Sequence, residues 1–374
     1  MKIAFVVHDY HQSGGHSRYV TELATRFSAA HEVHVFANTI QQNGATGIEF
    51  HRVPAWRRNA LTTILTFPVP ATRRLDRVFD IIHAQGLSSL RSDVLTAHIC
   101  SKGWFTARQE NGKSPHWKEH LFDRFISPLE KRIYQNARTA WVIAVSEKTN
   151  QELARYYGRT TRTSVIYHGV DTDRFDPQNR HRHRAEVLRE SGLADTDFVF
   201  LFVGDMRKGA MTAIKALQQS PGAKLMLVSR TPLSDYEQYA RKLGVSDRVA
   251  FRPPTDSIER YYAASDAFVF PTPYDAFGMV ISEAMASGLP VITSREAGAA
   301  ELIEDRRDGL LVGSASDAGE VAGHMKRLMA DPGLRQSLGS AARQKMGPHS
   351  WDTVAERTME VYRQVLSERG ECER

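Results

Sequence analysis

Short apolar runs, each followed by a segment with helical periodicity, recur along this chain and constrain its fold more than any other feature. The runs cover residues 3–7, 33–36, 81–84, 94–98, 141–145 and 164–167, and then 198–203, 225–228, 249–251, 267–270, 291–293 and 310–312. Strands that alternate with helices usually pair in parallel and bind ligands beyond their carboxyl ends. The pattern therefore predicts an α/β fold of doubly wound parallel sheets.

The chain length indicates two domains rather than one. At 374 residues it exceeds what a single ordinary core supports. We predict a first domain over 1–170, a linker over 171–190 and a second domain over 191–350. The linker contains the basic run Arg-His-Arg-His-Arg within 178–184, which follows Asp176-Pro177. A merely solvated basic loop is the alternative to a functional role for that run.

Composition and charge narrow the class of protein. The chain is 41% hydrophobic and 25% charged, which is typical of soluble globular proteins. Cys100 and Cys372 stand far apart without metal-ligand spacing, which favours a reducing compartment. Met1 leads at once into a strand and no run of 18 apolar residues follows, so we expect neither a signal peptide nor a spanning helix and predict a cytoplasmic protein.

The charge is also uneven along the chain. Up to His168 there are 22 Lys and Arg against 13 Asp and Glu, a net +9, and the remainder carries 27 against 30, a net −3. The first half is therefore expected to face something anionic.

The segment 271–290 carries the most specific chemistry. It follows an apolar run, and Gly288 and Pro290 end the helix that it predicts from Phe277 or Gly278 onward. Asp275 precedes this helix and Glu283 lies about 12 Å further along its axis, at 1.5 Å per residue. Between them, the free amides of the helix start favour an anion such as a diphosphate. The segment therefore predicts a ligand with polar groups at both ends.

This segment resembles the acidic-x7-acidic signature of family 4 retaining glycosyltransferases, and the match includes Phe-Gly and Glu-Ala-Met-Ala-x-Gly-x-Pro-Val. The resemblance implies the GT-B fold, with two doubly wound Rossmann-like domains facing across a deep cleft and a last helix, about 351–370, packed back on the first domain. It implies that Asp275, where the family usually has Glu, binds donor-sugar hydroxyls and that Glu283 binds the ribose. Further donor-binding residues would be Ala276, Phe277, Gly278, Met279 and Val280.

Residues at three other places in the sequence match motifs of the family. Gly14 and Gly15 form a double glycine near the donor diphosphate, after a strand and before a helix that Ser17 can cap. Arg207 and Lys208 precede Gly209 after the strand 198–203, where the family clamps donor phosphates; many members have arginine where this chain has Asp205. His98 ends a strand, as does a family histidine that faces the donor sugar; a structural histidine is the alternative.

Residues 101–140 interleave aromatic and basic side chains. Trp104, Trp117 and Phe125 alternate with cations that include Lys113, Lys118, Arg124 and Arg138. This pattern favours an interfacial helix on an anionic membrane. A core-packed helix with a basic outer face is the alternative, and no nucleic-acid motif accompanies the charge.

Together these features predict a glycosyltransferase that moves a sugar from a nucleotide diphosphate sugar to a glycan or glycolipid acceptor, with retention and with no cofactor or metal. We expect it in the cytoplasm, either free or bound to the inner face of the cytoplasmic membrane, in cell-envelope synthesis. A nucleotide-sugar 2-epimerase of the same fold, or a non-catalytic nucleotide-sugar-binding relative, are the alternatives. The donor sugar, base and acceptor stay open.

Overall fold

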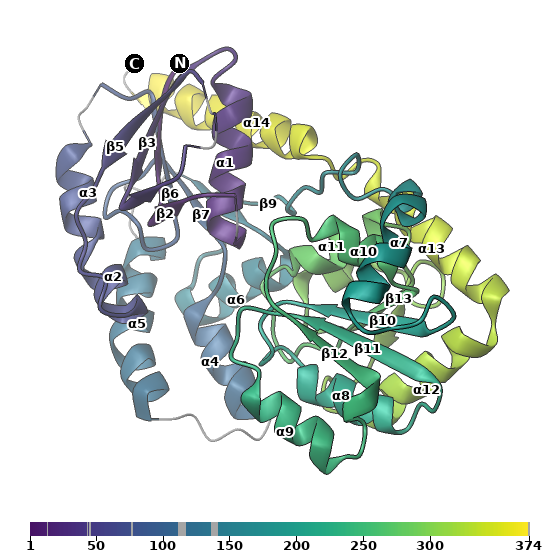
Figure 1. Cartoon of the computed structure of the whole chain (residues 1–374). Helices are drawn as coiled ribbons and strands as arrows, with labels where there is room; N and C mark the ends of the chain where they lie inside the picture. The colour runs from purple at the N-terminus through teal and green to yellow at the C-terminus, as the bar shows by residue number, and fades with distance from the viewer. Residues whose placement is uncertain are drawn as a thin grey trace. The chain divides into compact units, whose positions relative to one another are not determined.

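The computed structural model describes residues 1–12, 14–42, 44, 46–75, 78–110, 117–135 and 141–372, without the side chains of 117–119 and 371–372. The chain divides into two compact units, each containing a parallel sheet flanked by helices (Figure 1). The first unit comprises Met1–His168 and Trp351–Arg374, and the second comprises Gly169–Ser350.

The first unit contains a seven-stranded parallel sheet, counted over the described residues, in the order β5-β3-β1-β6-β7-β8-β9. Its strands are β1 (Lys2–Val6), β3 (Glu32–Ala37), β5 (Ile48–Arg52), β6 (Ile81–Gln85), β7 (Val94–Ala97), β8 (Trp141–Ala144) and β9 (Thr163–Val165), with the short pair β2 (Asp9–Tyr10) and β4 (Thr39–Ile40) beside it. Its helices are α1 (Gly15–Phe27), α2 (Ala60–Thr66), α3 (Pro68–Arg74), α4 (Ser101–Glu110), α5 (Trp117–Gln135), α6 (Glu147–Tyr157) and α14 (Trp351–Cys372).

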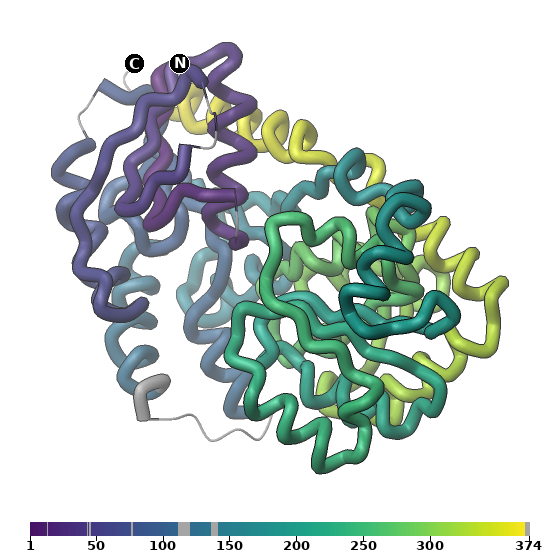
Figure 2. The backbone as a smooth tube through the Cα atoms, in the orientation of Figure 1, coloured from purple at the N-terminus to yellow at the C-terminus, as the bar shows by residue number. Residues whose placement is uncertain are grey.

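The last helix belongs to this first unit. α14 packs on α1, and Figure 2 shows the yellow C-terminal segment beside the purple N-terminal one. The contact is specific, because the Tyr362 hydroxyl lies 2.6 Å from Nδ1 of the buried His83 on β6. The His83 Nε2 in turn lies 2.6 Å from the Thr96 hydroxyl on β7. A buried histidine and a buried tyrosine thus satisfy each other at the centre of the unit.

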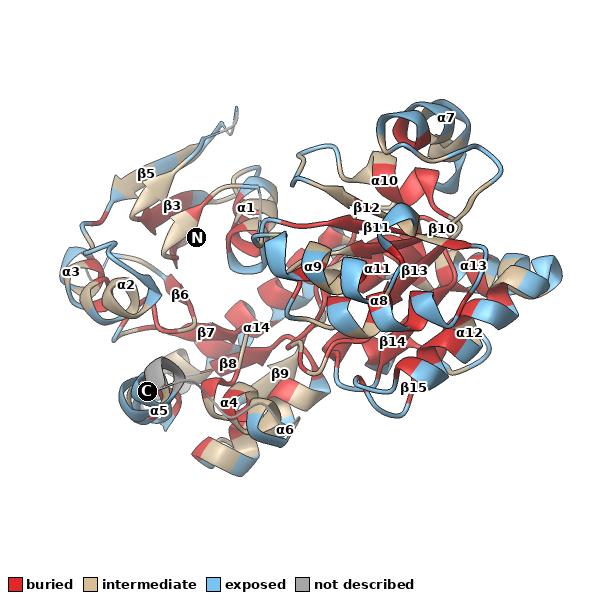
Figure 3. Cartoon of the chain, turned by 60° about the horizontal axis from the view of Figure 1, so that its bottom comes forward, coloured by how far each residue is buried: buried red, intermediate tan, exposed pale blue. Residues whose placement is uncertain are grey.

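The second unit contains a six-stranded parallel sheet among the described residues, in the order β12-β11-β10-β13-β14-β15. Its strands are β10 (Phe198–Val203), β11 (Ala223–Val228), β12 (Val249–Arg252), β13 (Ala267–Phe270), β14 (Val291–Ser294) and β15 (Leu310–Val312). Its helices are α7 (Arg180–Glu190), α8 (Ala210–Gln218), α9 (Ser234–Lys242), α10 (Glu259–Ala264), α11 (Met279–Ala286), α12 (Ala318–Ala330) and α13 (Pro332–Met346), with the 3₁₀ turns η1 (Pro177–Asn179), η2 (Ser246–Arg248) and η3 (Gly298–Leu302). Figure 3 shows buried strands between helices with exposed outer faces.

Every apolar run predicted as a strand contains a strand, and the doubly wound parallel architecture is confirmed. Three details differ from the sequence-based expectations. The continuous apolar runs did not include β5, because this short edge strand alternates polar and apolar side chains and is only partly buried. Ser17 does not cap α1, since the helix begins after Gly14 and the Ser17 hydroxyl instead donates to the Asp9 carbonyl at 2.7 Å.

The third difference concerns the segment 171–190, which we expected to be an exposed linker. It lies in the second unit, and its basic run begins α7. Arg180 and Arg184 both form ion pairs with Asp266, at 2.6 and 3.3 Å. These charge-assisted contacts, with guanidinium bonds to the Ala264 and Ser265 carbonyl oxygens, attach Arg180 and Arg184 to the unit, while His181 and Arg182 between them stay exposed.

Candidate functional site

The candidate site lies where the strand order of the second sheet reverses. β10 and β13 are neighbours, yet the chain leaves β10 toward β11 on one side and β13 toward β14 on the other. Ligands of open α/β sheets bind at such a switch point, outside the carboxyl ends of the strands. Here the turn after β10 carries Arg207 and Lys208, and the loop after β13 carries Asp275.

Gly209 allows these two loops to meet. Its φ is +103°, and a Cβ atom added to it would lie 2.1 Å from the carbonyl oxygen of Pro271. No real Cβ approaches another atom that closely, so only glycine permits this contact. The close approach brings the residue before Gly209 to the loop that follows β13.

Lys208 and Asp275 form an ion pair across the two loops. The ammonium nitrogen of Lys208 lies 2.6 Å from Asp275 Oδ2, and Asp275 Oδ1 accepts a bond from the Phe277 amide at 3.3 Å. The Asp275 side chain is only 12% exposed, whereas that of Lys208 is 38% exposed. The pair therefore holds a cation at the switch point with one side open to solvent.

Arg207 is oriented differently from its neighbour. Its guanidinium forms a fork with Asp205, with Nη2 2.5 Å from Oδ2 and Nε 3.0 Å from Oδ1, and its amide donates to Asp205 Oδ1 at 2.9 Å. Burial opposes ionisation of Asp205, but the bonds from Arg207 outweigh it and lower the pKa of this carboxyl below its ordinary value. Asp205 thus shapes the turn and neutralises Arg207, so that of the two predicted cations Lys208 is the one paired with the β13 loop.

The start of α11 faces the same loop. Gly278, with φ +92°, precedes the helix, and no side chain caps it. The first amides of α11 therefore lack intrahelical partners and favour an anion. Backbone bonds fix the loop, since the Gly298 amide donates to the Asp275 carbonyl at 3.0 Å and the Asp275 amide donates to Glu296 at 3.2 Å. Gly278, Met279 and Val280 are consequently placed beside Asp275, as the sequence predicted.

Glu283 lies in the second turn of α11 and is 6% exposed. Its Oε2 lies 3.0 Å from the hydroxyl of Tyr262, a fully buried residue of α10. The same hydroxyl lies 3.2 Å from the Val280 carbonyl oxygen. Sequence reasoning missed Tyr262. The signal was available, because a buried tyrosine needs a partner for its hydroxyl. Ala276 and Phe277, in the loop before α11, are buried.

A second group of predicted residues lies in the first unit. Gly14, with φ +92°, and Gly15 begin α1 and are exposed, and a Cβ on Gly15 would meet no atom within 4 Å. His16 stacks on His98, with ring centroids 4.3 Å apart, and His98 follows β7. The structure therefore brings together the double glycine and His98, two predictions from distant parts of the sequence.

His98 is held as a neutral ring. Burial lowers its pKa well below the ordinary value, and the nearby His16 and His168 add to this effect. Its Nε2 lies 2.8 Å from Gln85 Oε1, an amide oxygen that can only accept, so Nε2 carries the proton. Nδ1 is then a lone-pair acceptor, buried and without a hydrogen-bond partner among the described residues. This arrangement suits a ring that accepts a bond from a ligand hydroxyl.

Two family models match the chain in succession. The model described as Glycosyltransferase Family 4 matches residues 13–174, and the model described as Glycosyl transferases group 1 matches residues 183–345. Together they span most of the chain and cover both candidate groups of residues. The chain belongs to the group 1 glycosyltransferases.

Solved structures confirm the GT-B fold of this group 1 glycosyltransferase. The crystal structure of WaaG, a glycosyltransferase involved in lipopolysaccharide biosynthesis, superposes with a TM-score of 0.82 at 20% identity, over 96% of this chain and 99% of WaaG. HepE from Anabaena in complex with UDP-glucose gives 0.76 at 20% identity, over 97% of this chain and 100% of HepE.

Curated relatives match over shorter regions. A D-inositol 3-phosphate glycosyltransferase of Streptomyces bingchenggensis is 32% identical over 60% of this chain and 53% of its own length. An uncharacterised glycosyltransferase of Methanocaldococcus jannaschii is 29% identical over 61% of each chain. This group 1 glycosyltransferase thus matches about half to three fifths of the length of these curated relatives.

The region 101–140 contains both α4 and α5. Phe105, Ile126 and Tyr134 are buried, while the exposed face of α5 carries Leu121 and Phe125, 39% and 50% exposed. Exposed cations lie on the same helix, at positions Arg124, Lys131 and Arg132. Lys113 and Arg138 lie outside the described residues, as do the side chains of Trp117 and Lys118. No helix in the described part of the chain is long and apolar enough to cross a membrane.

Proposed function

We propose that this protein transfers a sugar from a nucleotide diphosphate sugar to an acceptor hydroxyl with retention of anomeric configuration. The observation that carries the proposal is the Lys208–Asp275 pair, 2.6 Å apart, at the switch point beside the uncapped start of α11. A fixed cation and free amides suit a diphosphate, and HepE, a neighbour in fold, was solved with UDP-glucose.

Lys208 would act on the leaving group. Negative charge grows on the diphosphate as the glycosidic bond breaks, and a preorganised cation stabilises that charge more than the ground state. Asp275 positions the Lys208 ammonium and offers its carboxylate to donor-sugar hydroxyls. With this cation and the α11 amides the departing diphosphate needs no metal, and its oxygen can accept the proton of the acceptor hydroxyl.

Glu283 would bind the ribose, as the acidic pair implies. Tyr262 holds one carboxylate oxygen at 3.0 Å, which fixes the direction of the other. In the first unit, the neutral His98 would accept a bond from a sugar hydroxyl through Nδ1, beside the amides of Gly14 and Gly15. The acceptor is proposed to be a glycan or glycolipid of the cell envelope, bound by the first unit.

A glycolipid acceptor would be accessible to the protein if α5 binds the surface of an anionic membrane. The outer face of α5 combines the exposed Leu121 and Phe125 with Arg124, Lys131 and Arg132, on a unit whose residues up to His168 carry a net +9. Rings at the headgroups and cations over anionic lipid are what an interfacial helix needs. The inner face of α5 packs on the core, so the helix would lie on the membrane without inserting across it.

The deciding experiment is a screen of nucleotide sugars for thermal stabilisation, followed by product analysis with and without acceptor. Ligand at about 100 times its dissociation constant adds about 2.7 kcal/mol to stability. Lys208→Ala should lower turnover about 100-fold or more, as loss of a transition-state donor does, with a smaller change in KM. Glu283→Gln should weaken binding of the free nucleotide. Lys215→Ala removes an exposed lysine of α8 in the same unit and is the control.

Each other outcome points to a different function. Full turnover by Lys208→Ala would remove that residue from the reaction. Epimerised sugar and free nucleotide without acceptor would identify a 2-epimerase, and donor binding without any turnover would identify a non-catalytic relative. Loss of activity in a chelator, restored by divalent ions, would contradict the metal-free mechanism.

A further inference from the structure

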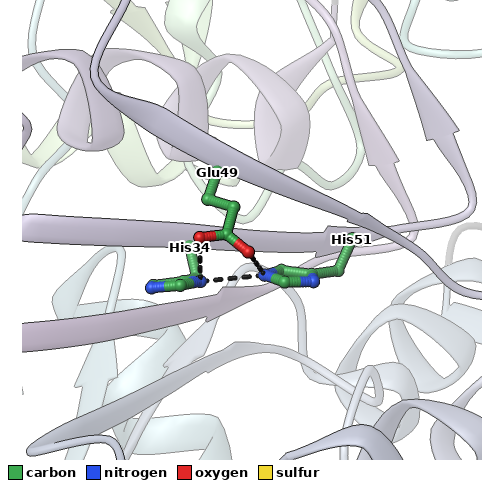
Figure 4. Close-up of side chains that lie close together, drawn as sticks. All are labelled: His34, Glu49 and His51. Atoms are coloured by element: carbon green, nitrogen blue, oxygen red, sulfur yellow. Dashed lines mark hydrogen bonds and ion pairs between the residues drawn. The ribbon is translucent and has the colours of Figure 1, made fainter.

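Two neighbouring strands of the first sheet each carry a glutamate two positions before a histidine. They are Glu32-Val-His34 on β3 and Glu49-Phe-His51 on the edge strand β5. Side chains two apart on a strand share a face. The parallel register pairs His34 with Glu49 and Phe36 with His51, so His34, Glu49 and His51 converge on one face (Figure 4).

The donor atoms of these three side chains form a compact triangle. His34 Nδ1 lies 2.8 Å from His51 Nε2, and the Glu49 oxygens lie 3.6 Å from the first and 3.3 Å from the second. A tetrahedral zinc ion with ligands at about 2.0–2.1 Å separates them by about 3.4 Å. Only the two imidazole nitrogens would have to move apart, by about half an ångström at that ligand distance.

The two histidine rings are held in place before any ion arrives. His34 is 4% exposed, and its other nitrogen, Nε2, lies 2.9 Å from Glu32 Oε1. A carboxylate accepts from Nε2–H, which leaves the lone pair on Nδ1, the atom that faces Glu49 and His51. The His51 ring stacks on Phe36, with centroids 4.3 Å apart and planes 13° apart.

Solvent reaches the site from one side. The side chains of His51 and Glu49 are 30% and 64% exposed, so an ion could enter and keep a water molecule as its fourth ligand. Lys2 is the nearby cation that opposes binding, but it pairs with Glu32 at 2.8 Å, outside the triangle. Two imidazoles and one carboxylate suit zinc and other first-row divalent transition metals.

We propose that His34, Glu49 and His51 bind one divalent transition-metal ion of the zinc class. The ion would link the edge strand β5 to β3 through side-chain ligands, in addition to the backbone hydrogen bonds between the two strands. An edge strand is the element of a sheet with fewest partners, and a cross-strand ligand set stabilises it without new backbone bonds. The site belongs to the first unit alone and is distinct from the residues proposed to bind the donor.

The test is zinc binding by the purified full chain, without any assay of activity. Competition with a chromophoric zinc chelator gives stoichiometry and affinity, and cobalt(II) absorption reports a tetrahedral site. We expect one zinc ion per chain and a rise of Tm with zinc. Glu49→Gln and His51→Asn, both at accessible positions, should abolish the cobalt spectrum and weaken binding at least tenfold, while Glu49→His should retain binding. Glu32→Gln should weaken affinity about tenfold, as loss of a carboxylate behind a ligand does.

The control removes two histidines elsewhere. His181→Asn with His183→Asn changes a helix on which side chains two positions apart do not share a face, and it should leave affinity unchanged. Circular dichroism confirms that each variant is folded. Absence of tight zinc binding by the unaltered chain would overturn the proposal, as would unchanged affinity in Glu49→Gln and His51→Asn, which would place bound zinc at other histidines such as His98.

Discussion

Replacing Gly209 by alanine tests the contact that places Lys208 beside Asp275. Two contributions to the loss of folding stability add at this position. The φ of +103° is unfavourable for any residue with a Cβ, by about 1–2 kcal/mol. The added Cβ would also stand 2.1 Å from the Pro271 carbonyl oxygen, a backbone atom that cannot rotate away. Overpacking of this kind costs typically about 1–3 kcal/mol.

Gly192→Ala supplies the matched control. Gly192 lies in the same unit with φ +70°, and its Cβ would meet no atom within 4 Å. Its cost in stability is therefore the backbone term alone, and the stiffer unfolded chain offsets about 0.4–1 kcal/mol in both variants. The two variants should differ by the overpacking term, about 1–3 kcal/mol. At about 2–4 °C per kcal/mol for a unit of this size, the Tm of Gly209→Ala should lie about 2–12 °C below that of Gly192→Ala.

Differential scanning calorimetry measures both variants, and nucleotide binding is measured below the transition. Because the displaced turn carries Lys208 away from Asp275, Gly209→Ala should also lose nucleotide affinity, whereas Gly192→Ala should retain it. Equal Tm values for the two variants would refute the close approach of the two loops. Normal nucleotide affinity in Gly209→Ala would refute the link between that approach and the site.

Two further predictions concern the first unit. Burial raises the pKa of Glu130 from its ordinary 4.5 to about 7, so between these pH values the folded chain keeps a proton that the unfolded chain releases, and stability falls as pH rises. Glu130→Gln should therefore gain Tm over the unaltered chain as pH rises from 5 to 8; a constant difference would contradict this. Serine at three exposed α5 cations should weaken binding to anionic vesicles about a hundredfold, at about 1 kcal/mol per cation, whereas the same change at three cations of the second unit should not. The first set is Arg124, Lys131 and Arg132, and the control set is Arg182, Arg189 and Lys242. Equal loss in both sets, or no vesicle binding at low salt, would exclude the α5 surface.

Local sequence patterns were sufficient to predict the strands with continuous apolar runs, their parallel arrangement and the helix that follows Asp275. These properties depend on local periodicity and on residues such as Gly278, which can adopt a positive φ, and Pro290, which cannot continue a helix; both effects act within a few positions of the chain. Asp275 and Glu283 became candidates through their spacing, and Lys208 became one through a family motif after the strand 198–203. The apolar runs missed β5, because an edge strand buries little and so carries no continuous apolar run.

Which of these residues contact one another could be read only from the folded chain. The 2.6 Å bond from Lys208 to Asp275 joins residues 67 positions apart and depends on the order of β10 and β13 in the sheet. The hydrogen bonds from Arg207 to Asp205 and from Tyr262 to Glu283 were likewise not predicted, since each pairing depends on packing that no local pattern encodes. The same holds for His34, Glu49 and His51. Their period of two places each pair on one face of its strand, but a shift of one residue in the register of β3 and β5 would separate them.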